Sequence, residues 1–188
     1  MSAAGPVQPE QFVLDIVKIL TGLGIPYAVV GALAVSYYGV PRSTADADMV
    51  IWLRGPETEE ELKERLMAVN YSVKSRRGDP GDPISRCIVV EDEFENRMDL
   101  LAGIHGMDPA AIERRTFTSL MNSPLEMIGA EDLVAMKLFA GGLQDLEDAR
   151  GILQVSGRLL NLDLLRSIAN RYGPDVVVTL EELLGTGS

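Results

Sequence analysis

The sequence lacks the cysteine pairs that stabilise many secreted proteins and the long apolar runs that cross membranes. It contains one cysteine, Cys87, so no internal disulfide can form, and we expect a reducing compartment. No apolar run approaches the length of a membrane span, and the first residues lack the basic and apolar regions of a secretory signal. These absences predict a cytoplasmic protein that does not enter a membrane.

Basic residues are also scarce. The chain has 17 lysines and arginines against 28 aspartates and glutamates, which gives a formal net charge of -11. Because nucleic-acid binding depends on clustered cations, this balance argues against a protein that coats nucleic acid. The one dense basic stretch contains Lys74, Arg76 and Arg77. We interpret it as a solvated loop, and the alternative is an edge that guides an anionic ligand.

Histidine and cysteine each occur once, and we assign neither of them chemistry. His105 follows Asp99 closely in the chain, which leaves a metal or acid–base role open. A single histidine near a turn is usually exposed and inactive, so we expect a bystander. Cys87 lies in the apolar run "RCIVV" and is expected to be a small buried side chain.

The 188 residues, 46% of them hydrophobic, suffice to bury a real core. Apolar residues at helical spacing predict a helix over residues 8–22, and an alanine-rich apolar segment predicts another over 32–39. Acidic residues in the first turn, with Lys63 and Arg65 further along, predict a helix over 57–70. Short β-branched runs predict strands over 27–30 and 45–52.

The middle of the chain reads as strands and the end reads as helices. Strand composition recurs at 71–75, 84–91 and 96–103, and residues 116–121 and 124–128 form a candidate hairpin across Asn122 and Ser123. Asp108 and Pro109 mark the start of a short helix. From Ala130 onward the pattern is helical.

The predicted fold is therefore α/β (α+β), with a mixed β-sheet packed by helices and a C-terminal helical extension. We expect a core over residues 1–128 and a helical region over 129–188 packed on it.

Three acidic residues stand in strand-like segments. Asp46 and Asp48 are two apart, so in a strand their side chains share one face. Asp99 is a third acid in an alternating segment. Adjacent carboxylates repel unless a cation lies between them, and oxygen donors suit Mg²⁺. The plainer interpretation is that all three are solvated charges at strand ends or on an edge strand.

Gly31 follows a short strand and opens the helix that starts at Ala32. Amide groups at such a turn can hold phosphate without a cationic side chain, although a lone glycine is more often only a turn residue. The combination in this order is more specific, because Gly31, Asp46, Asp48 and Asp99 would meet at one sheet edge.

These residues resemble the nucleotidyltransferase fold shared with DNA polymerase beta. Within it, "VVGALA" and the segment Arg42-x-Thr44-x-Asp46-x-Asp48 are similar to the bacterial abortive-infection type nucleotidyltransferase toxins and their uncharacterised relatives. A later "KLFAGGLQDLEDA", with Lys137, Asp145 and Asp148, resembles a second motif of that group. The likeness runs from about residue 25 to 153.

The resemblance implies an enzyme that transfers a nucleoside monophosphate from a nucleoside triphosphate (NTP) to an acceptor hydroxyl. It implies two Mg²⁺ ions, or Mn²⁺, held by Asp46, Asp48 and Asp99. Nucleotide contacts would come from the remaining site residues: Gly31, Ala32, Arg42, Lys137 and Asp145. Lys137 pairs with a phosphate in this interpretation, or is an ordinary helix-surface lysine.

Further expectations concern Arg42, Thr44 and the two acids after Lys137. Arg42 contacts phosphate or pairs with one of the acids. Thr44 is assigned to strand entry. Asp145 and Asp148 share a helical face and would orient Lys137 or Arg42, unless they are simply solvated.

The resemblance leaves the acceptor, the partner and the activity open. The acceptor is an RNA end, a protein or a small-molecule hydroxyl, and a toxin would have a cognate antitoxin protein. Ala32 replaces the second glycine or serine of the pattern, and Gly142 replaces an arginine. The alternative is therefore a catalytically degenerate member that binds a nucleotide or a protein.

Overall fold

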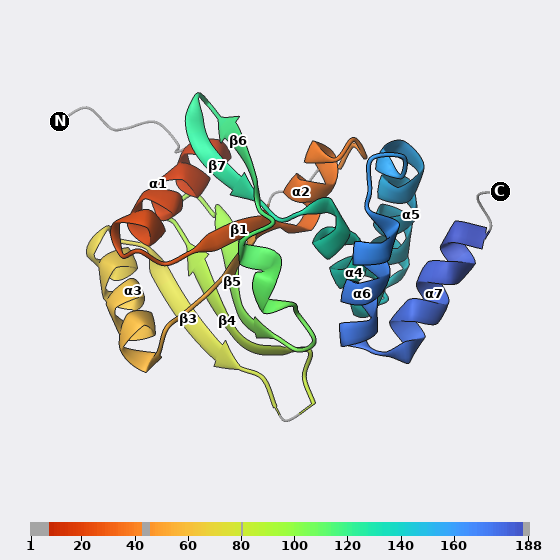
Figure 1. The fold of residues 1–188 in the computed structure, drawn as a ribbon. Coiled ribbons are helices and arrows are strands. Elements are labelled where there is room, and N and C mark those ends of the chain that lie inside the picture. The colour runs from red at the N-terminus through yellow and green to blue at the C-terminus, as the bar shows by residue number, and fades with distance from the viewer. Residues whose placement is uncertain (1–7, 43–45, 80, 186–188) are drawn as a thin grey trace.

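The computed structural model describes residues 8–42, 46–79 and 81–185, so Thr44 lies outside the described residues. Its strands are β1 (Tyr27–Val30), β2 (Asp46–Ile51), β3 (Ser72–Arg77), β4 (Ile84–Glu91), β5 (Arg97–Ile104), β6 (Thr116–Leu120) and β7 (Ser123–Met127). They form one seven-stranded mixed sheet in the order β3-β4-β5-β2-β1-β7-β6 (Figure 1). The predicted mixed α/β fold is confirmed.

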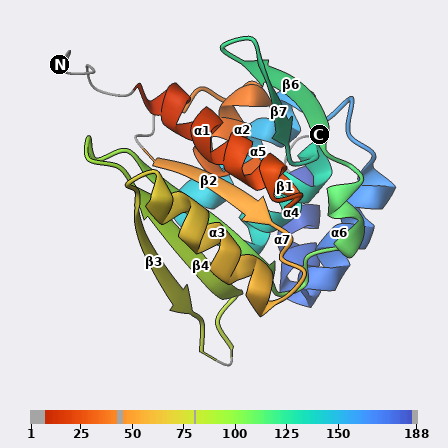
Figure 2. The same cartoon turned by 90° about the vertical axis from the view of Figure 1, so that its left-hand side faces the viewer.

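Helices cover the sheet on two sides. They are α1 (Pro9–Gly22), α2 (Gly31–Tyr37), α3 (Pro56–Ala68), α4 (Ala130–Ala140), α5 (Leu143–Ser156), α6 (Leu162–Tyr172) and α7 (Pro174–Gly185). Helices α1 and α3 lie on one side of the sheet. Helices α4 to α7 form a helical layer on the other side, at the right of Figure 1 and behind the sheet in Figure 2. No described helix is long and apolar enough to span a membrane.

The burial of β1 and β2 positions the acidic residues. All four residues of β1 are buried, which suits a strand in the interior of the sheet between two helical layers. Strand β2 changes along its length: Asp46 is exposed and Asp48 half-buried, whereas Met49, Val50 and Ile51 are buried. The apolar half anchors β2 in the core, and its first half therefore presents carboxylates at the rim.

The chain segment around residues 105–128 differs from the sequence prediction in one detail. Strands β6 and β7 form the predicted hairpin, but its turn residues are Met121 and Asn122, at φ 48° and 63°. Ser123 instead pairs with Leu120 in the ladder, because two left-handed residues make the two-residue turn that matches strand twist. The short helix after Asp108 is a 3-10 turn (Pro109–Ile112), capped by the Asp108 side chain at the amide of Ala110.

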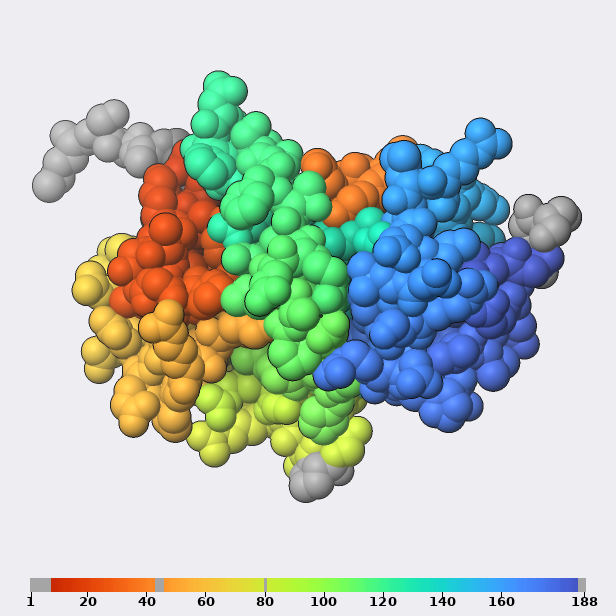
Figure 3. Space-filling model, in the orientation of Figure 1, coloured from red at the N-terminus to blue at the C-terminus, as the bar shows by residue number. Residues whose placement is uncertain are grey.

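An ion-pair cluster joins the sheet region to the helical layer. Arg114 donates two hydrogen bonds to Asp132 on α4, at 2.8 and 2.7 Å, and lies 3.0 Å from Asp108. Asp132 is 2% exposed. In the space-filling view the segment that carries Arg114 packs against the blue helical lobe (Figure 3). Arg114 therefore neutralises a buried charge at this junction.

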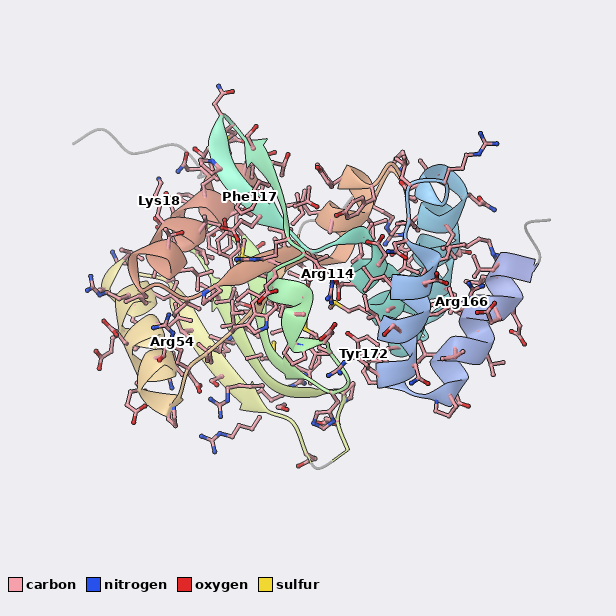
Figure 4. The ribbon with its side chains drawn as sticks, viewed as in Figure 1. Lys18, Arg54, Arg114, Phe117, Arg166 and Tyr172 are labelled. Carbon is pink, nitrogen blue, oxygen red and sulfur yellow. The ribbon has the colours of Figure 1, made fainter. Side chains whose placement is uncertain are left out.

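We expect Arg114→Ala to lower the free energy of unfolding by about 3–5 kcal/mol, because it leaves the buried Asp132 carboxylate without its cation. Arg166→Ala is the matched control, since Arg166 pairs with the exposed Glu181 between α6 and α7 (Figure 4). Urea denaturation should show no measurable loss for the control. Equal losses in the two variants would contradict this assignment.

Candidate active site

The strand register brings the predicted acids together. Val30 of β1 pairs with Asp48 of β2, and Asp48 pairs with Asp99 of β5. Paired residues point to the same face and neighbouring strands are about 4.8 Å apart, so the two carboxylates lie side by side. Asp46 stands two residues before Asp48 on that face.

Gly31 approaches Asp48 so closely that a side chain would not fit. A Cβ at Gly31 would lie 2.1 Å from Oδ2 of Asp48, and the residue has φ +62°. Both the left-handed backbone and the contact require glycine here. The turn that the sequence predicted as a phosphate cradle is therefore in direct contact with the central acid.

The electrostatics of Asp48 depend on burial and on its neighbours. Burial raises the pKa of the Asp48 carboxyl, and the nearby Asp99 and Asp46 carboxylates raise it further, while Lys137 and Arg97 act in the opposite direction. The site thus disfavours a bare negative charge on Asp48. A bound cation would relieve this cost.

Arg97 is a further residue of this centre, and the sequence pattern does not single it out. Its Nε and Nη2 donate to the two carboxylate oxygens of Asp99 at 2.9 and 3.1 Å. The available signal was its position two residues before Asp99, which places both side chains on one face of β5. Arg97 is 42% exposed, so this pair lies toward solvent.

Lys137 lies on α4 and is held by two acids of α5. Its Nζ is 2.7 Å from Oδ1 of Asp145 and 3.0 Å from Oδ2 of Asp148. Burial alone would lower the pKa of Lys137, but these hydrogen bonds outweigh it and raise the pKa. Nε of Arg42 lies 3.5 Å from Oδ1 of Asp148, which is buried. Asp145 and Asp148 are therefore ion-paired with cationic side chains and are not simply solvated.

A cavity of about 170 Å³ connects Gly31 and Asp48 to Lys137 and Asp145. Most of its wall is apolar and comes from the end of β1, from β4, β5 and α4, and from the loop before β4: Val30, Pro83, Ile84, Leu101, Ile104, Leu133, Met136, Phe139 and Ala140. The sequence does not predict this wall, because apolar residues of a helix such as α4 follow the same pattern whether they face a core or a cavity.

The other sequence-predicted residues are distributed around this centre. Ala32 follows Gly31 in the first turn of α2, and Gly142 precedes α5 as its N-cap. His105 is exposed near a turn, as expected of a bystander. The basic stretch with Lys74 and Arg76 is exposed on the edge strand β3, so it is strand and not loop. Cys87 is buried and free, as predicted.

The donor chemistry of Asp46, Asp48 and Asp99 fits a hard divalent cation. These three side chains come from two adjacent strands and offer only oxygen donors. Asp48, the central acid, is partly desolvated beside the like charge of Asp99. Among the described residues, no group of three or more His, Cys, Asp or Glu side chains is already gathered as a metal cluster. The pairing of Asp99 with Arg97 is consistent with this, because it draws one donor toward a different partner.

Solved structures share this fold at low sequence identity. The protein ANT(2'')-Ia, in complex with adenylyl-2''-tobramycin, is 12% identical with a TM-score of 0.59, and the match covers 87% of this chain and 95% of that one. A nucleotidyltransferase-like antigenic protein from Paracoccidioides brasiliensis is 14% identical with a TM-score of 0.57, covering 95% and 88%. The chain has a nucleotidyltransferase-type fold.

A third structure agrees. The lincosamide antibiotic adenylyltransferase LnuA, bound to lincomycin, is 14% identical with a TM-score of 0.50, and the match covers 79% of this chain and 98% of that one. No family model and no curated protein sequence matches the chain. The solved structures therefore support the resemblance predicted from the sequence for the fold alone.

Gly31→Ala should destabilise the protein more than Gly24→Ala. Both residues have φ +62°, so alanine costs about 1 kcal/mol or more at either position. Gly24 has open space around its Cβ position, whereas Gly31 does not. Only Gly31→Ala must also displace the Asp48 carboxylate. Equal losses in urea denaturation would show that the contact with Asp48 does not constrain the turn.

Asp48→Asn should stabilise the metal-free protein at neutral pH. Folding raises the pKa of Asp48, so the folded protein binds a proton at this carboxyl more tightly than the unfolded chain does. The resulting stabilisation is present at acid pH and is lost as the pH rises through the raised pKa. The stability gain of the variant should therefore be small near pH 4 and grow toward pH 7. Urea denaturation with a chelator at several pH values measures it, and a variant less stable than wild type at pH 7 would contradict the sign.

Proposed function

We propose that this protein is a Mg²⁺-dependent nucleotidyltransferase that moves a nucleoside monophosphate from an NTP to an acceptor hydroxyl and releases pyrophosphate. The observation that carries the proposal is the pairing of Asp48 with Asp99 directly beside the Gly31 turn. Repelling carboxylates at one rim are costly to stability and suit a site that receives a cationic ligand.

The order of groups across the sheet supports one direction for the proposed reaction. Gly31 follows β1, Asp48 lies on β2, and Asp99 lies on β5. The amides of Gly31 and Ala32 would hold the terminal phosphates, so the leaving pyrophosphate lies on their side. In an in-line displacement the acceptor oxygen approaches from the opposite side, next to Asp99. Its bond to the α-phosphorus forms as the α–β phosphoanhydride bond breaks, and its proton leaves to solvent.

Asp46, Asp48 and Asp99 would hold the metal. Bound there, two Mg²⁺ ions, or Mn²⁺, would lower the pKa of the acceptor hydroxyl and neutralise the leaving oxygens. Lys137 would add a fixed positive charge for a phosphate, since Asp145 and Asp148 keep it protonated and aimed. Arg42, paired with Asp148, would support the same side.

For the acceptor we propose a small-molecule hydroxyl. Two proteins with this fold were solved with adenylyl-2''-tobramycin and with lincomycin. The net charge of -11 also disfavours a polyanionic acceptor. An RNA end or a protein hydroxyl, and a role as the toxin of a toxin–antitoxin pair, remain the alternatives from the sequence resemblance. Incubation with labelled NTP and either small-molecule hydroxyls, RNA or protein separates them.

A second candidate function is nucleotide binding without chemistry. It is favoured by Arg97, which already neutralises Asp99, and by Gly142, which provides no cation where the sequence pattern has arginine. Such a protein would be stabilised by nucleotide but would release no pyrophosphate.

Asp99→Asn and Asp48→Asn should each lower Mg²⁺-dependent pyrophosphate release on the order of 10²-fold or more, because each removes charge stabilisation at the reacting centre. The assay uses each of the four NTPs with a cell extract as the source of acceptor.

The matched control is Asp163→Asn, which removes a fully exposed carboxylate at the start of α6 and should leave the rate unchanged. Full activity of Asp48→Asn would rule out the proposed site. Nucleotide-dependent stabilisation of the wild type without any pyrophosphate release would favour the binding module instead.

A further inference from the structure

We propose that Arg97 is an internal counterion of Asp99 that competes with a divalent cation for this carboxylate, so that Arg97 lowers the affinity of the site for metal. The inference rests on the proposed function, in which Asp46, Asp48 and Asp99 hold the metal. It adds a residue that controls how readily this site fills.

Arg97 engages both oxygens of the third acid. Its Nε donates to Oδ1 of Asp99 at 2.9 Å, and its Nη2 donates to Oδ2 at 3.1 Å. Such a two-pronged contact is the geometry in which an arginine recognises a carboxylate most specifically. A metal ion bound to either oxygen would share that oxygen with a guanidinium group of like charge. Arg97 and the metal are therefore alternative partners of Asp99.

Arg97 is placed where it can leave Asp99. It is the first residue of β5, and 42% of its side chain is exposed. Exposed ion pairs contribute little to stability, because water solvates both charges when they separate. By contrast, Lys137 is 15% exposed and ion-paired with two carboxylates. Of these two cations, Arg97 is the one that an entering metal ion can displace.

A displaced Arg97 has acids on both neighbouring strands. The ladder pairs it with Asp46 of β2 and with Glu91 of β4, and paired residues share a face of the sheet. The hydrogen bonds to Asp99 raise the pKa of Arg97 most, and Asp46 and Glu91 raise it further. Glu91 lies 3.3 Å from Lys74, and its carboxylate has the capacity to accept a second cation. Release from Asp99 therefore does not leave Arg97 without a counterion.

The opposite role for Arg97 makes the opposite prediction. If the arginine only oriented Asp99 toward the metal, its removal would loosen that carboxylate and weaken metal binding. In the proposed role, its removal exposes both oxygens and takes away a repelling charge. An adjacent arginine lowers the affinity of a carboxylate for a proton by about tenfold or more, and solvent exposure reduces this effect. The sign of the change in metal affinity therefore separates the two roles.

Titration of the full chain with Mn²⁺ in the absence of nucleotide tests the inference, with free Mn²⁺ measured by electron paramagnetic resonance. Arg97→Gln should bind Mn²⁺ about three- to tenfold more tightly than the wild type. Arg97→Lys keeps the charge but loses the two-pronged contact, so its affinity should lie between the two. At equal concentration, Mn²⁺ should also raise the Tm of Arg97→Gln more than that of the wild type.

The matched control is Arg76→Gln. Arg76 is exposed on the edge strand β3, two strands away from β5. Burial raises the pKa of Cys87 most, and Arg76 and Arg97 both oppose that rise, so both charges act on the same part of the sheet. The control removes the same charge without removing a partner of Asp99, and it should change the Mn²⁺ affinity by less than about twofold.

Equal or weaker Mn²⁺ binding by Arg97→Gln, or an equal gain in Arg76→Gln, would overturn the inference and leave the proposed function intact. Mn²⁺ binding that becomes measurable only in Arg97→Gln would support the inference. If neither the wild type nor Arg97→Gln binds Mn²⁺, even with ATP present, the proposed function itself fails, and the inference fails with it.

Discussion

The carboxylates of Asp48 and Asp99 face the same way from paired positions on two adjacent parallel strands, and their repulsion is the constraint around which the site is arranged. The sheet cannot relieve it by rotation, because Met49, Val50 and Ile51 anchor β2 in the core. Relief must come from cations. Arg97 supplies one from the strand itself, and Lys137 supplies another from the helical layer.

Because Lys137 lies on α4, the electrostatic potential at Asp48 depends on how the helices pack. Its ammonium group is held by Asp145 and Asp148 of α5, and Asp148 also faces Arg42 of the segment that leads toward β2. The buried Asp148 is thus compensated from both sides of the site. The distance between Lys137 and Asp48 then depends on how α4 and α5 pack, to which the Arg114–Asp132 pair contributes.

The sequence predicted the elements well because their signals are local. Apolar periodicity, the Asp108 cap and the glycine at 31 each act within a few residues, and the alternation of β2 and β5 placed the three acids on shared faces. The register of β2 on β5 is a long-range property, so the sequence could only suggest that Asp99 joins Asp48. Arg97 and the Phe139 wall escaped prediction because a surface arginine and an apolar helix residue have many equivalent uses. The turn at Met121 and Asn122 shifted by one residue because strand register decided it.

The two cations of the site differ in how firmly they are held, and this difference determines how a ligand can enter. Lys137 is 15% exposed and bonded to two carboxylates, so it stays in place. Arg97 is 42% exposed and holds Asp99 by a solvent-facing pair, a type of interaction that contributes little to stability. In the proposed function, a divalent cation at Asp48 and Asp99 would therefore compete with the weaker partner only. Displacement of Arg97 would free both oxygens of Asp99 while the positive charge at Lys137 is retained, so the proposed metal site would exchange its internal counterion for an external one.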